Sequence, residues 1–146
     1  SRRYGTFGTG FTYSGHPVPA AVALETQRIY EDLKIGDHVK AVAPHFQSRL
    51  RAFADHSLVG EVRGLGLIGA VELVEDKAAR RNFDPARKIA PRLMALAAEH
   101  GLIVRALPND AVAFCPPLII DITQIDDMFD RFGQAIDDLA RELART

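Results

Sequence analysis

The sequence predicts an α+β fold, in which a small antiparallel sheet carries helices on one face. Strand-type runs occur in two pairs, and each pair is joined by a link short enough for a hairpin. Segments with a helical repeat of apolar residues precede, separate and follow these pairs. Hairpins and helices arranged in this way are typical of one sheet layer packed against one helix layer.

Two helices are expected before the first strand. Apolar residues at steps of four, seven and four predict a helix over 17–34, with Gly36 as its stop. His16 is the expected N-cap, because the residue before a proline avoids the α-helical region. A tighter apolar repeat, at every third or fourth residue, predicts the second helix over 37–55.

The four strands form two expected hairpins. The runs 58–63 and 67–74 are joined by a glycine-rich turn, and the runs 102–106 and 111–115 by a turn containing proline and asparagine. Gly69, inside the second run, suggests that another backbone or a ligand passes close to that strand.

Two further helices complete the expected order. Asp84 and Pro85 predict the N-cap and first residue of the third helix, which Gly101 ends. Thr123, followed three residues later by Asp126, resembles a capping box at the start of a final amphipathic helix.

Composition excludes several classes of partner. The net charge of −1, with acids and bases interspersed, provides neither a basic field for nucleic acid nor a polybasic patch for a membrane. Cys115 is the single cysteine, so no internal disulfide can form, and no charged-then-apolar leader or 18-residue apolar run is present. We expect a cytoplasmic protein. No cluster has metal-ligand spacing, so we expect no metal.

The most unusual stretch is FTYSGHPVP at residues 11–19. Its Thr-Tyr-Ser-Gly turn places two hydroxyls and several backbone N–H groups just before a predicted helix, a geometry suited to an anion. The residue types alone leave both a plain helix start and an anion site open.

Three stretches carry a resemblance to a known family. GTGFTYSGHPVPAA, EVRGLGLIGAVELV and EHGLIVRALPNDAVAFCPPLII resemble the C-terminal segments of class III (omega) aminotransferases, which are pyridoxal 5'-phosphate (PLP) enzymes of fold type I. The resemblance covers essentially the whole chain. It implies that residues 1–34 are the tail of the large cofactor domain and its connecting helix, and that residues 35–146 are the small C-terminal domain. It also implies a homodimer or higher homo-oligomer with shared active sites.

The resemblance assigns roles to three residues. Phe11 and Thr12 match the pair that contacts the PLP phosphate of the partner subunit, and Arg105 matches an arginine that pairs with substrate carboxylates. On residue type alone, Arg105 would be an exposed strand-end arginine. Arg63 is a weaker candidate for a substrate contact, and His16 is expected to be a structural cap.

The resemblance also implies a lysine that forms a Schiff base with PLP, and this lysine is not recognisable here. The four lysines fall on helix ends, a charged loop and a helix face, and none lies in an apolar strand; they are Lys34, Lys40, Lys77 and Lys88. We therefore expect no catalytic lysine in this chain, and no activity from the chain alone.

The resulting hypothesis is a segment of an aminotransferase that moves an amino group from an omega-amino acid or amine to pyruvate. Two alternatives within the enzyme class remain open: a 2-oxoglutarate-linked enzyme of the ornithine or 4-aminobutyrate type, and an aminomutase. An alternative from another class is a non-catalytic dimerisation or assembly module.

Overall fold

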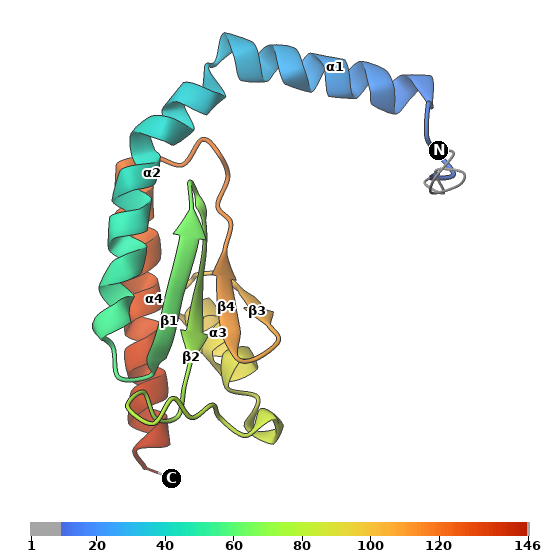
Figure 1. The fold of residues 1–146 in the computed structure, drawn as a ribbon. Coiled ribbons are helices and arrows are strands. Elements are labelled where there is room, and N and C mark those ends of the chain that lie inside the picture. The colour runs from blue at the N-terminus through green and yellow to red at the C-terminus, as the bar shows by residue number, and fades with distance from the viewer. Residues whose placement is uncertain (1–9, 146) are drawn as a thin grey trace, which may run out of the picture. The chain divides into compact units, whose positions relative to one another are not determined.

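The computed structural model describes residues 10–145 (Figure 1), and the chain divides into two compact units after Gly36. The first unit contains helix α1 (Pro17–Asp32), as predicted. His16 is its N-cap: the residue is extended, and its Nδ1 accepts a hydrogen bond from the Val18 N–H at 3.2 Å. The predicted stop at Gly36 is wrong, because the chain turns at the left-handed Lys34 (φ 50°) and Gly36 already lies in the next helix. Of the tail expected over residues 1–34, residues 1–9 lie outside the described residues.

The α+β order that the sequence predicts is confirmed. After α1 the elements are α2 (Ile35–Ala52), the 3-10 turn η1 (Phe53–Asp55), β1 (Val59–Leu65), β2 (Ile68–Leu73), the 3-10 turn η2 (Pro85–Arg87), α3 (Ile89–Glu99), β3 (Arg105–Leu107), β4 (Ala111–Phe114) and α4 (Ile122–Leu143). Among residues 10–145, no helix is both long and apolar enough to cross a membrane.

The four strands form one antiparallel sheet in the order β1-β2-β4-β3, so the two predicted hairpins lie side by side. Leu65 pairs with Ile68 at the end of the first hairpin, and Gly66 in its turn has φ +60°, a conformation that favours glycine. At the centre of the sheet, Val71 of β2 pairs with both Val62 and Val112.

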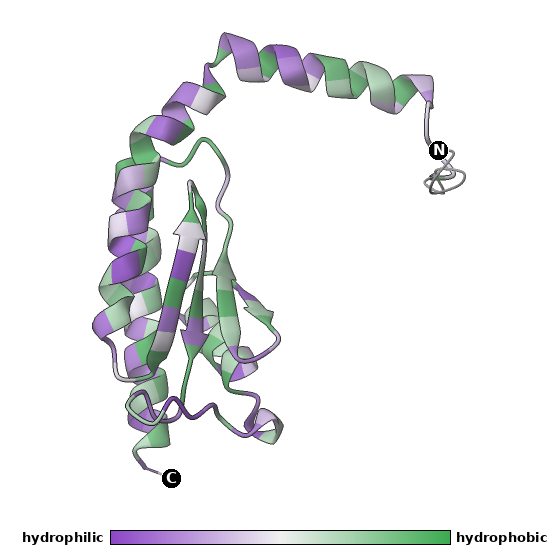
Figure 2. Ribbon diagram, in the orientation of Figure 1, coloured by the Kyte–Doolittle hydropathy of each residue, from purple (hydrophilic) through white to green (hydrophobic). Residues whose placement is uncertain are grey.

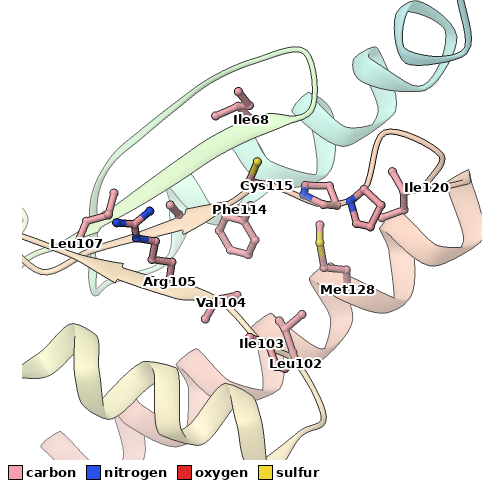
Figure 3. Close-up of a pocket in the computed structure, with 13 residues that line it drawn as sticks. Ile68, Leu102, Ile103, Val104, Arg105, Leu107, Phe114, Cys115, Ile120 and Met128 are labelled. Atoms are coloured by element: carbon pink, nitrogen blue, oxygen red, sulfur yellow. The ribbon is translucent and has the colours of Figure 1, made fainter. Parts of the chain in front are cut away.

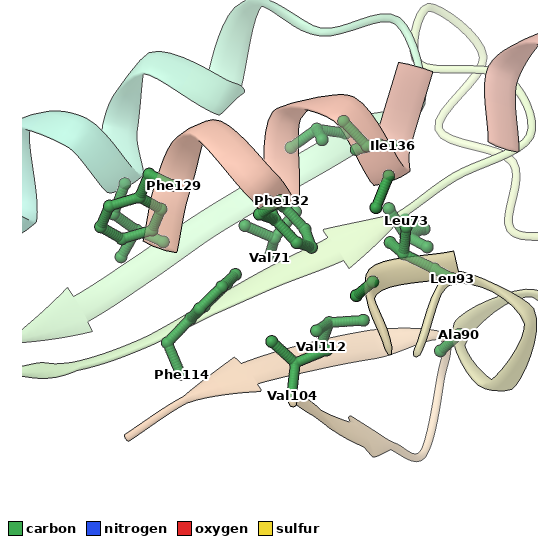
Figure 4. Packing of buried hydrophobic residues seen from close by; sticks show 14 of the residues in the cluster. Val71, Leu73, Ala90, Leu93, Val104, Val112, Phe114, Phe129, Phe132 and Ile136 are labelled. Atoms are coloured by element: carbon green, nitrogen blue, oxygen red, sulfur yellow. The ribbon is translucent and has the colours of Figure 1, made fainter. Parts of the chain in front are cut away.

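Helices α2, α3 and α4 supply the core that covers the inner face of this sheet. Alternate residues of β2 and β4 point inward and are buried, and the apolar stripe of α4 packs on them, as Figure 4 shows. The ring of Phe114 lies 4.8 Å from that of Phe132, at an interplanar angle of 87°. Edge-to-face pairs of this kind contribute about 0.5–1.5 kcal/mol beyond their buried area. Figure 2 shows hydrophobic and hydrophilic residues mixed along β1, where Val59 is buried and Val62 half-buried while the charged Glu61 and Arg63 are exposed.

Two predicted helix starts are wrong in detail. Asp84 caps η2 rather than α3, since its carboxylate accepts from the Ala86 N–H at 2.9 Å. The residue before α3 is left-handed and makes no side-chain cap, and instead Asp110, from the β3–β4 turn, accepts from the Ala90 N–H at 2.9 Å. A capping residue distant in sequence leaves no local motif to detect.

The start of α4 also differs. Asp121, not Thr123, is the N-cap, and Asp121 and Gln124 form a reciprocal capping box. Asp121 is extended while Thr123 is already helical, so the same type of box begins two residues earlier than predicted.

The close neighbour expected at Gly69 is a side chain rather than a backbone or a ligand. A Cβ at this position would lie 2.3 Å from Leu50 Cδ2, so the glycine makes room for an isobutyl group from α2. Gly64 meets a different constraint: its Cβ would lie 2.7 Å from the Ile68 carbonyl oxygen and 2.9 Å from the Gln47 amide.

Polar contacts also tie α4 to its neighbours. His45 of α2 lies 2.8 Å from an Asp126 carboxylate oxygen, and His100, at the end of α3, lies 2.7 Å from Asp138. Arg131 donates to the His100 carbonyl oxygen at 2.9 Å, which satisfies an acceptor at the C-terminus of α3. The hydrogen bond from His100, together with Arg141, lowers the pKa of Asp138.

We expect Gly64→Ala to destabilise residues 37–145 by about 1–3 kcal/mol, because one of the clashing atoms belongs to the backbone. Gly133→Ala is the matched control: it lies inside α4, and its Cβ would make only an ordinary contact of 3.9 Å with Phe53. Helix propensity predicts that this control stabilises by about 0.5–1 kcal/mol. Urea unfolding of both variants tests the prediction, and equal effects would contradict it.

We also expect the Asp138 contact to make stability pH-dependent. A carboxyl whose folded pKa is lowered stabilises the fold above its unfolded pKa of about 3.9, and this contribution is lost as the pH falls through the folded pKa. Asp138→Asn should therefore reduce the loss of stability as the pH falls below about 5. Asp55→Asn, in η1, is the control; the same reduction in the control would refute the assignment.

Candidate functional site

A surface cavity of about 580 Å³ lies where β3, β4 and the loop after β4 meet (Figure 3). Its lining is apolar except for one arginine and one thiol; the lining residues are Ile68, Leu102, Ile103, Val104, Arg105, Leu107, Ala113, Phe114, Cys115, Pro116, Pro117, Ile120 and Met128. A concave apolar site with a single convergent charge is the usual form of a small-molecule site.

Arg105 is the first residue of β3, an edge strand of the sheet, and its side chain is exposed at the cavity. Ile103 and Leu107, two residues to either side, are apolar, and Ile103 is 93% exposed. Figure 3 shows Arg105 beside Leu107, with Ile120 toward the other end of the cavity. Within residues 10–145 no carboxylate pairs with Arg105, so its guanidinium is available to an anion from outside.

Arg63 provides the contrast. It shares a cross-strand row with Arg105: Arg63 pairs with Ala70, Ala70 with Ala113, and Ala113 with Arg105. Arg63, however, lies 2.9 Å from Glu72 and 3.5 Å from Glu61, and the hydrogen bond to Glu72 raises its pKa. Of the two arginines on the outer face of this row, only Arg105 lacks an internal partner among the described residues.

The turn that precedes α1 contains the other predicted site residues. Phe11 donates to Ser14 Oγ at 3.3 Å and accepts from the Ser14 N–H at 3.0 Å, and the His16 N–H reaches the Tyr13 carbonyl at 3.2 Å. The N–H groups of Thr12 and Tyr13 and the Thr12 hydroxyl have no acceptor within residues 10–145. This exposed turn therefore presents three hydrogen-bond donors beside a helix N-terminus, as an anion requires.

The turn belongs to the first unit of the chain and the cavity to the second. Arg105 and the apolar residues around it come together within the second unit. Nothing in the sequence indicates that Ile68 and Met128 join this cavity, because they come from a strand end and a helix that meet only through tertiary contacts.

The four lysines are all exposed, which agrees with their predicted surface positions. Lys40 pairs with Asp37, and Lys77 donates to the Ala54 carbonyl. Cys115 is also exposed and lines the cavity. In the described part of the chain no group of three or more His, Cys, Asp or Glu side chains could hold a metal ion.

A family model for aminotransferase class-III matches residues 2–136. The chain belongs to this family. Class III aminotransferases are PLP enzymes that act on amines and keto acids.

The relatives extend well beyond this segment. Putrescine–pyruvate aminotransferase of Pseudomonas aeruginosa is 44% identical over 137 residues, which are 93% of this chain and 30% of that protein. Gamma aminobutyrate transaminase 3 of Solanum lycopersicum is 40% identical over 94% of this chain and 26% of its own length. The omega transaminase of Pseudomonas jessenii, solved in complex with PMP, is 42% identical with a TM-score of 0.85, and the match covers 99% of this chain and 32% of that one. The chain thus spans about a third or less of each of these proteins.

Proposed function

We propose that this chain is the C-terminal segment of a transaminase that transfers an amino group from an omega-amino acid or amine to pyruvate, and that the cavity at Arg105 receives its substrates. The observation that carries the proposal is an exposed arginine with no partner among residues 10–145, set in an apolar cavity of a class III aminotransferase segment. A guanidinium in this setting binds a carboxylate bidentately, while the apolar lining accepts the rest of the molecule.

The lining also favours a keto acid with one carboxylate. Arg105 is the only charged residue that the described part of the chain contributes to the cavity. Pyruvate has one carboxylate, whereas 2-oxoglutarate has a second that would need another cation or water. An amine donor without a carboxylate needs the arginine to move aside, which an exposed side chain on an edge strand can do. The pyruvate-linked relative at 44% identity supports this choice.

The turn before α1 suits the phosphate group of PLP. Phe11 and Thr12 lie in an exposed turn with unused donors, which suits a phosphate, and in the proposed homodimer they complete the partner subunit's site. When bound, PLP supplies the electron sink that the transfer requires. No lysine of this chain fits its aldehyde end, since all four are exposed and none lines the cavity. Residues 1–34 would then be the tail of the cofactor domain and residues 35–146 the small domain. A cytoplasmic location remains a prediction.

A 2-oxoglutarate-linked enzyme is the second candidate. Its support is the diaminobutyrate–2-oxoglutarate transaminase of Halomonas elongata, which is 40% identical over 97% of this chain and 31% of its own length. The remaining alternatives, an aminomutase and a non-catalytic assembly module, have no comparable support. An assembly module has no need for a cavity arginine that lacks a partner among the described residues.

We expect Arg105→Leu, in the full-length enzyme that contains this segment, to raise the KM for pyruvate on the order of 100-fold, because two charge-assisted hydrogen bonds are lost. The KM for an amine without a carboxylate should stay within about twofold. Arg63→Leu is the control, since it removes an arginine of the same sheet face that is paired internally. Steady-state kinetics with pyruvate and with 2-oxoglutarate test the proposal. An unchanged KM for both acids in Arg105→Leu would reject it, and faster turnover with 2-oxoglutarate would favour the second candidate.

We also expect residues 1–146 alone to show no transamination, because the chain offers no buried lysine to hold PLP. Borohydride reduction with PLP, followed by peptide mapping, should label no lysine stoichiometrically. Stoichiometric labelling of one of the four lysines would show that this chain has a cofactor site of its own.

A further inference from the structure

Helix α2 contributes no residue to the cavity lining, yet two of its side chains hold backbone segments that form cavity walls. One wall is the loop between β4 and α4, which supplies Pro116, Pro117 and Ile120. Another is the β1–β2 turn, which leads into Ile68, the first residue of β2. Both segments are connections between elements, which are the least constrained parts of a small domain.

His38 holds the first wall. Its Nε2 lies 2.9 Å from the Ile120 carbonyl oxygen, and a carbonyl only accepts, so Nε2 carries the proton. Ile120 is the anchor of this loop: its side chain is buried, and its N–H donates to the Pro117 carbonyl at 3.0 Å.

The loop has few other restraints. Two of its residues are prolines without an N–H, and Leu118 and Ile119 are exposed. Among residues 10–145, His38 is the one side chain that hydrogen-bonds to residues 116–120. Loss of this bond would free the loop while leaving the helices that flank it intact.

Gln47 holds the second wall. Its Nε2 donates to the Gly66 carbonyl at 2.9 Å and to the Ile68 carbonyl at 3.2 Å, across the turn of the first hairpin. The side chain is only 7% exposed and lies directly over Gly64, which has no side chain to displace it. The backbone from which Ile68 enters the cavity is therefore fixed from α2.

We infer that His38 and Gln47 are positioning residues that fix the two walls opposite β3 and so select which substrate side chain fits beside a carboxylate held at Arg105. This inference rests on the proposed function, because it requires the cavity to be the substrate site. Neither residue touches the cavity, so both act through the backbone that they hold. The substrate class concerned is amines and amino acids that differ in the bulk of their apolar side chain.

The test uses the full-length holoenzyme with a small and a bulky aryl amine, and compares His38→Leu, which removes the donor, with His38→Gln, which retains an N–H at similar reach. His45→Leu is the matched control: His45 lies on the same helix and pairs with Asp126, and neither residue lines the cavity. Ile68→Ala serves as a direct change of one wall. Hydrogen exchange over residues 116–121 gives a readout that is independent of activity.

We expect His38→Leu to speed exchange over residues 116–121 by about three- to tenfold, since one hydrogen bond of ordinary strength is lost. The ratio of kcat/KM for the bulky amine to that for the small amine should change by a similar factor, mainly through KM. His38→Gln should restore both values, and His45→Leu should alter neither. Gln47→Met should shift the ratio in the same direction as Ile68→Ala, without faster exchange over residues 116–121.

Other outcomes overturn the inference. If His38→Leu lowers thermal stability but leaves the ratio unchanged, or if Ile68→Ala leaves it unchanged, the residues are merely structural. Should His38→Leu fail to fold, His38→Asn replaces it, because its amide is too short to reach the Ile120 carbonyl. Failure of the proposed function is recognised separately, as an unchanged KM for keto acids in Arg105→Leu, while the exchange measurement still reports whether His38 holds the loop.

Discussion

The antiparallel pairing of β2 with β4 is the contact on which the rest of the second unit depends. It joins two local hairpins into one sheet through Gly69–Phe114, Val71–Val112 and their neighbours. Because side chains alternate along a strand, this register turns Val71 and Val112 toward the helices and Ala70 and Ala113 away from them. A slip of one residue would bury the alanines and expose the valines. The same register therefore builds the core and leaves the opposite face free for the row that ends in Arg105.

The sequence predicted a helix correctly where the residues that determine it lie within or next to that helix. The helical repeat located α2 and α4, the proline after His16 fixed the start of α1, and Gly101 marked the end of α3. The prediction of a helix start was wrong where the capping residue is distant in the sequence. Asp110, twenty residues beyond Ala90, caps α3, so the local Asp84-Pro85 signal marked only a 3-10 turn.

The sequence indicated the charged residue that lines the cavity but not the shape of the cavity. The resemblance assigned a carboxylate-binding role to Arg105, and that role stays a prediction. The structure shows an exposed guanidinium between apolar neighbours, with no partner among residues 10–145. The cavity itself could not be predicted, because Ile68, Met128 and Pro117 come from three segments that meet only after the sheet has formed. Gly69 shows the same limit: the glycine indicated a close neighbour correctly, but only the packing identified it as Leu50.

The two arginines of the outer face show how an internal ion-pair partner determines whether a guanidinium is available to another anion. Arg63 and Arg105 are of the same type and lie in the same cross-strand row, so their intrinsic chemistry is equal. Glu72 and Glu61 satisfy Arg63, and a substrate carboxylate would have to displace one of them. The side chains of Ile103 and Leu107 contain no hydrogen-bond acceptor for Arg105. A carboxylate that enters the cavity therefore displaces only water from the guanidinium. Apolar neighbours thus keep one cation available, and the backbone restraints from α2 keep the walls around it in place.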